Sequence, residues 1–251
     1  MACHHQRSAS LPSFPSYSID SSVEQELHTL KSHIISSPSA TTIDAACDGL
    51  RRLVDVYTSV EEMTRLPSNH AGLCSARQRK AVEAELDMSL ELIDLCSSMQ
   101  ESLAELKTCV HETRLVLKRG DAAAAQIKVE SFVRTARKAQ KPLMKKTTAS
   151  SNKAADEGCS RVVRVMAEAR ETGVSLLEST SRMLPKQMGG SASASKWSLV
   201  SRRFQTRKVV VCEEEELRKL ERGVGDLGEG VEFLFRRLIQ SRVCLLNVLS
   251  L

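Results

Sequence analysis

The longest continuous pattern in this chain is a helical one. From about Ala76 until Gly120, apolar residues recur every three or four positions. The residues of this stripe are Val82, Leu86, Leu90, Ile93, Met99, Leu103, Leu106, Val110 and Leu117. Such spacing places side chains on one face of an α-helix, and a helix from Ala76 to Arg119 is roughly 66 Å long at 1.5 Å per residue. The pattern therefore predicts an elongated fold.

The C-terminal segment has the most regular spacing. Its apolar residues alternate steps of three and four, which is typical of helices that pack side by side at shallow angles, as in coiled coils. They are Leu217, Leu220, Val224, Leu227, Val231, Leu234 and Leu238, with Leu245 and Leu249 in the same register. Four glycines, Gly223, Gly225, Gly228 and Gly230, each weaken this helix by about 1 kcal/mol relative to Ala. They either let a neighbouring helix approach closely or mark a break.

Two further features of this segment lead to predictions. The acidic run at 213–216 is expected to cap the last helix, because carboxylates oppose the positive end of the helix dipole. The apolar end at 242–251 is expected to pack into the protein's own bundle, with a partner-binding or membrane-facing helix as the alternatives.

The remaining sequence predicts four shorter helices. Aromatic residues make up only 3%, with 11 Gly and 6 Pro, which argues against an all-β fold of this size. We place helices from 20–22 to Pro38, from 41–42 to 66, from 122 into a basic stretch with Pro142, and from about 162 to Pro185. The predicted fold is all-α: an elongated, mainly antiparallel helical bundle with long helices and a disordered N-terminal tail.

Domain organisation follows from composition. Residues 1–19 are rich in Ser and Pro and are interpreted as a flexible tail. Residues 20–251 are interpreted as one helical bundle domain, with a polar break near 147–155 and a flexible linker at 186–195.

The chain is expected in the cytoplasm, with the nucleus or a membrane surface as alternatives. Its eight cysteines are scattered without a C-x-x-C pair, which favours reduced thiols, and several sit at apolar helical positions. The N-terminus lacks the apolar stretch of a secretory signal. No run reaches the length needed to span a bilayer, so we predict no transmembrane segment.

Four motifs in order resemble a plant family of unknown biochemical function. These are Arg-Ser-Ala-Ser-Leu-Pro at 7–12, Val-Tyr-Thr-Ser-Val-Glu-Glu-Met-Thr-Arg-Leu-Pro at 56–67, Leu-Asp-Met-Ser-Leu-Glu-Leu-Ile-Asp-Leu-Cys at 86–96 and Arg-Arg-Leu-Ile-Gln-Ser-Arg-Val-Cys-Leu-Leu-Asn-Val-Leu-Ser at 236–250. Together they resemble the family grouped with the BYPASS proteins. The resemblance implies a plant-specific helical protein linked to root and shoot development. It implies no established enzymatic activity and transfers no catalytic residue.

The N-terminal tail contains a candidate phosphorylation motif. Arg7 precedes Ser10 by three residues, as basophilic kinases prefer, and Pro12 follows two residues later. This is the arrangement of a phosphoserine ligand for 14-3-3 proteins, whose Arg cluster binds the phosphate. The alternative is a Ser-rich tail that matches by chance.

Two basic segments are candidate anion-binding sites. Residues 118–146 hold nine Lys and Arg against two acids, and residues 196–208 hold five with no acid, while the whole chain has a net charge of +5. The candidate residues are Arg134, Arg137, Lys138, Lys141, Lys145, Lys146, Arg202 and Arg203. Anionic lipid headgroups or phosphate backbones are the ligands that such segments attract. Few aromatics accompany them, so we expect no nucleic-acid partner, and a solvated helix face remains the simplest interpretation.

No catalytic or cofactor motif is present in the sequence. G-x-S-x-G, H-E-x-x-H, the P-loop and G-x-G-x-x-G are all missing. An N-terminal Ala2-Cys3-His4 has the spacing of a copper or nickel site, but we predict neither a metal nor a cofactor. The sequence therefore predicts a non-enzymatic interaction or scaffold protein, phospho-regulated at its tail, and the family resemblance implies a role in development. The alternative is a peripheral protein that binds anionic lipid through residues 118–146 and 196–208.

Overall fold

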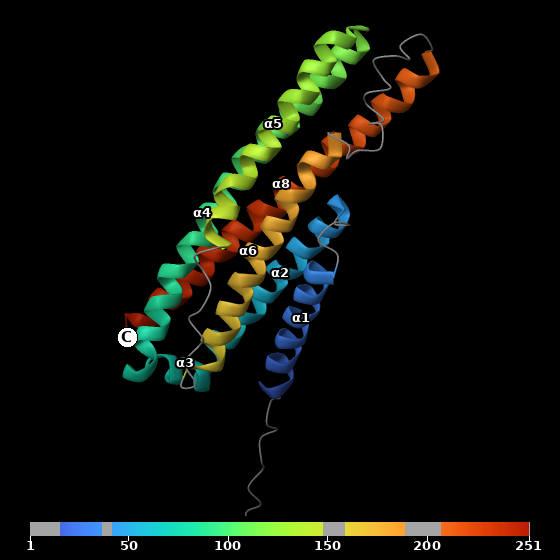
Figure 1. The fold of residues 1–251 in the computed structure, drawn as a ribbon. Helices are drawn as coiled ribbons and strands as arrows, with labels where there is room; N and C mark the ends of the chain where they lie inside the picture. The colour runs from blue at the N-terminus through green and yellow to red at the C-terminus, as the bar shows by residue number, and fades with distance from the viewer. Residues whose placement is uncertain (1–15, 37–41, 148–158, 189–206, 251) are drawn as a thin grey trace, which may run out of the picture.

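The described part of the chain consists of long helices. The structure, a computed structural model, describes residues 16–36, 42–147, 159–188 and 207–250, and within these ranges it contains no strand. The helices are α1 (Ser16–Ser36), α2 (Ile43–Arg65), α3 (Pro67–Leu73), α4 (Ala76–Lys118), α5 (Ala122–Thr147), α6 (Arg161–Met188) and α8 (Arg207–Leu249). They form one elongated bundle, so the predicted all-α fold is confirmed (Figure 1).

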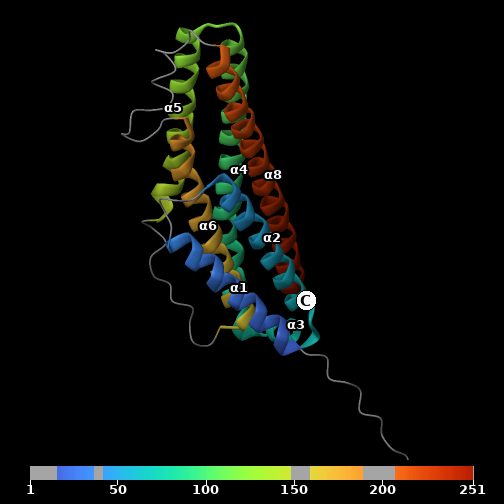
Figure 2. The same cartoon turned by 90° about the vertical axis from the view of Figure 1, so that its right-hand side faces the viewer.

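The two longest helices, α4 and α8, run antiparallel along the length of the bundle (Figures 1 and 2). Each has 43 residues, which corresponds to about 65 Å. At one end of the bundle, α4, α5 and α8 extend together, whereas α1, α2, α3 and α6 lie toward the other end. The core is a single cluster of Leu, Val, Met and Ala side chains from all seven helices.

Local sequence explains where α4 ends and α5 begins. Gly120 adopts φ +77°, a left-handed conformation that glycine reaches without a Cβ penalty. The Asp121 carboxylate then accepts a hydrogen bond from the Ala124 N–H at 2.9 Å and caps α5. The predicted long helix and its stop at Gly120 are confirmed.

The glycines of α8 let α2 pack against it closely. A Cβ at Gly223 would lie 2.8 Å from Ile43 Cγ2, and one at Gly230 would lie 3.1 Å from Leu50 Cδ1. The helix continues through all four glycines, so none of them marks a break, and Gly223 and Gly230 serve the close approach of α2. Gly228 is different because a Cβ there would meet nothing within 4 Å.

Two predicted helix ends were wrong. Pro142 lies inside α5, and Pro185 lies inside α6, which continues to Met188. Proline removes one backbone hydrogen bond, but Leu143, directly after Pro142, and Met188, three residues after Pro185, are both buried. Because burial of these side chains requires the helix to continue, packing outweighs the local penalty.

The ends of three predicted segments also differ from expectation. Helix α1 begins at Ser16, so the predicted tail at 1–19 overlaps its first turn, and 186–188 of the predicted linker belong to α6. Helix α8 begins at Arg207, ahead of the acidic run at 213–216, which therefore does not cap it. The division into a tail and one domain stays a prediction, and most of the break at 147–155 lies outside the described residues.

The two classes of glycine in α8 should respond oppositely to alanine. Gly228→Ala is expected to raise the free energy of unfolding by about 0.5–1 kcal/mol, because alanine is the better helix former and the site is open. Gly223→Ala is expected to be neutral or destabilising by about 1 kcal/mol, because its Cβ meets the stiff Ile43 side chain. Urea unfolding of both variants tests this, and equal stabilisation of both would contradict the close α2–α8 packing.

Candidate interaction surface

The outer face of α5 carries four exposed cations. Arg134, Arg137, Lys138 and Lys141 all point to solvent, while Phe132, Ala136, Ala139 and Leu143 face the core. The alternation follows from the helix period of 3.6 residues, which separates the two sets onto opposite sides. No ion pair joins any of these four cations to another described residue.

The remaining predicted site residues are less defined. Lys145 and Lys146 belong to α5, but the placement of their side chains is not described. Arg202 and Arg203 lie outside the described residues, as do Arg7, Ser10 and Pro12. The structure therefore brings together the four cations of 134–141, and the phosphorylation motif stays a prediction.

Two exposed acids of α4 lie at the same level along the bundle as this cationic face. Lys128 Nζ of α5 lies 2.7 Å from Glu112 Oε2 of α4, which sets the alignment of the two antiparallel helices. Counting along both helices from this pair, the exposed Glu101 and Glu105 lie level with the 134–141 stretch. Carboxylates of α4 are therefore present at the same level as the cations of α5.

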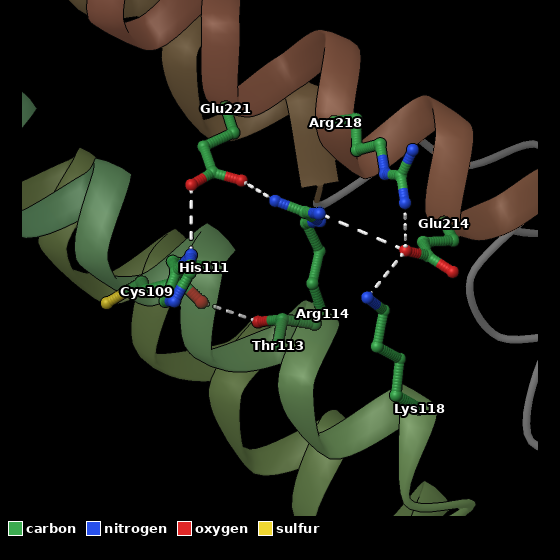
Figure 3. Close-up of polar contacts among 8 residues, drawn as sticks. All are labelled: Cys109, His111, Thr113, Arg114, Lys118, Glu214, Arg218 and Glu221. Atoms are coloured by element: carbon green, nitrogen blue, oxygen red, sulfur yellow. Dashed lines mark hydrogen bonds and ion pairs between the residues drawn. The ribbon is translucent and has the colours of Figure 1, made fainter.

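A network of ion pairs joins the distal half of α4 to α8 (Figure 3). The Arg114 guanidinium bonds Glu221 of α8, and His111 Nδ1 lies 3.0 Å from the other oxygen of the same carboxylate. Arg114 Nε is buried without an acceptor, so its guanidinium depends on carboxylates of α8. Burial alone would raise the pKa of Glu221, but hydrogen bonds from Arg114 and His111 lower it below its usual value.

Glu214 extends this network by one further turn of α8. Its Oε1 lies 3.0 Å from Lys118 Nζ of α4 and 2.8 Å from an Arg218 nitrogen one turn along α8. The hydrogen bond from Lys118, together with that from Arg218, lowers the pKa of Glu214. This acidic residue, which the sequence assigned to a helix cap, instead holds α8 against α4.

A buried ion pair joins α4 to α6 in the core. Arg170 Nε lies 3.0 Å from Glu85 Oε1, and both residues are less than 9% exposed. Burial raises the pKa of Glu85 to about 7, while the Arg170 charge and hydrogen bond oppose the shift. A pair of this kind is strongly destabilising when one partner is removed, because the remaining charge stays buried alone.

The cysteine and histidine residues form no recognisable catalytic or metal centre in the described ranges. Burial raises the pKa of the Cys96 thiol to about 12 and that of Cys47 to about 11, which keeps both thiols protonated. The exposed Cys74 has its sulfur 3.7 Å from His70 Nδ1. No group of three His, Cys, Asp or Glu residues that could hold a metal ion occurs among the residues described.

The chain matches the model of one known protein family. A family model described as Protein BPS1 matches residues 49–218 and 203–248, which include most of α2, all of α3 to α6 and most of α8. The chain belongs to the BPS1, or BYPASS, family. No curated protein matches it, and no solved structure does. The predicted resemblance is confirmed, and it supports a plant-specific helical protein in a family of unknown biochemical function.

Over the ranges that the structure describes, each helix falls short of the length and apolar character needed to cross a bilayer. The predicted absence of a transmembrane segment agrees with this finding.

Sequence reasoning missed both ion-pair systems of this BPS1-family chain. Glu85 and Arg170 each lie among buried apolar residues of their helices, next to Leu86 and Ala169. A charged residue on an apolar face is the signal that could have found them, because such a charge needs a partner. The Arg114 network carries no such signal, since its members lie at the border of the buried face and their partners are a hundred residues away.

Glu85 should make stability depend on pH. Its folded-state pKa of about 7 lies above its unfolded value, so the folded protein binds the extra proton and the free energy of unfolding falls as pH rises from about 4.5 to 7. Glu85→Gln should remove this fall, at most about 3 kcal/mol. Urea unfolding from pH 5 to pH 8 measures it, and parallel pH curves for both proteins would contradict the assignment.

The partner residue gives a matched comparison. Arg170→Met should cost about 3–5 kcal/mol at pH 8 and less at pH 5.5, where a protonated Glu85 needs no cation. The control is Arg79→Met, which breaks a pair with Glu83 in which both side chains are exposed and should cost less than about 1 kcal/mol.

The Arg114 network should also respond to pH, with the opposite sign. Glu221→Gln should lower stability by about 1–2 kcal/mol at pH 7. Because the folded-state pKa of Glu221 is lowered, the loss should shrink as the pH falls below the usual range of a carboxyl group. Glu232→Gln, which breaks an exposed pair with Arg236 on the same helix, is the control. Equal effects of the two variants in thermal unfolding would refute a special role for the network.

Proposed function

We propose that this BPS1-family protein is a non-enzymatic interaction protein that acts as a helical scaffold in plant development. The observation that carries the proposal is the outer face of α5, where Arg134, Arg137, Lys138 and Lys141 are exposed and unpaired within the described part of the chain. Most arginines elsewhere on the bundle are paired with acids. A set of free cations on one helix face favours a partner of opposite charge.

An acidic segment of a partner protein fits this face best. The four cations span about two turns of one helix, roughly 10 Å, and the exposed Glu101 and Glu105 lie at the same level on α4. A peptide can follow so narrow a strip. An anionic membrane is broad, and its headgroups would also meet the carboxylates of α4.

The second candidate function is peripheral binding to anionic lipid through the same cations. It is favoured by their number, since each Lys or Arg near an anionic leaflet contributes about 1 kcal/mol. Regulation by phosphorylation of Ser10 is part of the proposal and stands on the Arg7 and Pro12 motif alone.

The experiment compares two charge variants of the full chain. One changes Arg134, Arg137, Lys138 and Lys141 to Gln, and the control changes the exposed Arg77, Lys80, Lys107 and Lys219 to Gln, so that both lose the same charge. A fluorescent peptide of Glu and Gly should bind wild type and control alike and bind the α5 variant about tenfold more weakly at low salt.

Flotation with vesicles separates the two candidates. With phosphatidylcholine vesicles, with or without phosphatidylserine, the chain should stay unbound if the partner is a protein. Flotation that needs phosphatidylserine and is lost only in the α5 variant would instead establish the lipid function. Binding to neither peptide nor vesicle would refute both.

A further inference from the structure

Four of the exposed apolar side chains lie on α4 and on the C-terminal part of α8. Leu90 of α4 and Ile239, Val243 and Leu246 of α8 are 45%, 40%, 51% and 48% exposed. We call these four residues the outer strip. Single exposed apolar residues are normal on protein surfaces, but a contiguous group indicates an interaction site.

Helical geometry places the four residues of the outer strip side by side. Ile239, Val243 and Leu246 are spaced by four and three, so they share one face of α8. Arg242 bonds the Leu86 carbonyl oxygen, and its Nη1 lies 2.6 Å from Ser89 Oγ. Because α4 and α8 are antiparallel, Leu90, one turn beyond Leu86, lies level with this stretch of α8.

The C-terminal part of α8 is therefore apolar on two faces. Leu238, Leu245 and Val248 are at most 2% exposed and pack into the core, which agrees with the expectation that this end packs into its own bundle. The outer strip faces away from that core. The buried Leu238, Leu245 and Val248 stabilise the bundle, whereas the four side chains of the outer strip remain partly exposed to solvent.

Acidic residues border the outer strip on the α4 side. Asp87, Glu91 and Asp94 are exposed on the outward face of α4, and none forms an ion pair with a described residue. Toward solvent on α8, the strip is bordered by neutral Gln240 and Asn247. The site thus combines an apolar centre with one negative edge.

We propose that the outer strip docks an amphipathic helix of a partner protein, with Lys or Arg along the edge that faces α4. The four-and-three spacing of Ile239, Val243 and Leu246 is the spacing at which one helix packs along another. The carboxylates of α4 select a basic edge on the incoming helix by charge complementarity. They also disfavour an anionic membrane as the occupant.

A second copy of the chain complements this surface less well. The basic face of a second copy lies on α5. Among the described residues of α5, Ile127 is the one large apolar residue that is exposed. One apolar side chain does not match a strip of four. The outer strip is separate from the cationic face of α5, so this inference does not depend on the proposed function.

The test measures binding of two synthetic helices to the full chain. One fluorescent peptide is an amphipathic helix of Leu and Lys, and the other has the same Leu face with Glu in place of Lys. In fluorescence anisotropy, the Leu/Lys peptide should bind at least about tenfold more tightly than the Leu/Glu peptide. Val243→Gln with Leu246→Gln should weaken it by about tenfold or more.

Matched variants control for fold and for net charge. Phe233→Gln removes a side chain of α8 that is 57% exposed and lies outside the outer strip, and it should leave affinity unchanged. Asp87→Asn with Glu91→Gln should weaken the Leu/Lys peptide several-fold, whereas Glu101→Gln with Glu105→Gln, farther along α4, should not. Thermal unfolding confirms that every variant folds.

Three results would overturn the proposal. The first is equal binding of the Leu/Lys and Leu/Glu peptides, and the second is binding that the strip variant does not change. The third is self-association of the chain in sedimentation velocity that Val243→Gln with Leu246→Gln abolishes, because the occupant would then be a second copy. None of these bears on the α5 face, whose variant should bind the Leu/Lys peptide like wild type.

Discussion

The antiparallel pairing of α4 and α8 is the contact on which the rest of this bundle depends. Both helices are 43 residues long, and neither can be stable alone in water without an apolar face to bury. Buried Leu and Val residues line the seam, Arg242 bonds α4 near one end, and Glu214 and Glu221 bond it near the other. Helices α2 and α6 pack on the lower part of this pair, and α5 continues it at the distal end (Figure 1).

Charge is used in two distinct ways in this molecule. Buried and half-buried charges, such as Glu85, Arg170 and Arg114, are paired between helices and hold the bundle together. The exposed Glu101 and Glu105 of α4 and the exposed cations at 134–141 of α5 form no ion pair with a described residue. The net charge of +5 sums the paired and the unpaired charges and so does not distinguish them. A partner can recognise the unpaired charges, because each of them can form a new ion pair with the partner. A surface charge that is already paired contributes little to binding.

Sequence reasoning succeeded where one local cause dominates. The stop at Gly120, the end of α2 before Pro67 and the exposed cations of 134–141 follow from backbone sterics and helix period. It failed where tertiary packing competes with a local rule, as at Pro142 and Pro185. It also misassigned the acidic run at 213–216, because a charge near an expected helix end can equally bind a cation of another helix.

The pattern of apolar residues by itself determined that this chain forms long helices and packs them side by side, because helix period and heptad spacing are local properties. Which surfaces remain for partners was decided only by the tertiary structure. Leu245 and Leu246 are neighbours with the same side chain, yet one is buried in the core and the other is exposed in the outer strip. Their burial differs because α2 and α4 cover only one side of α8. The positions of those helices depend on contacts between residues far apart in the chain.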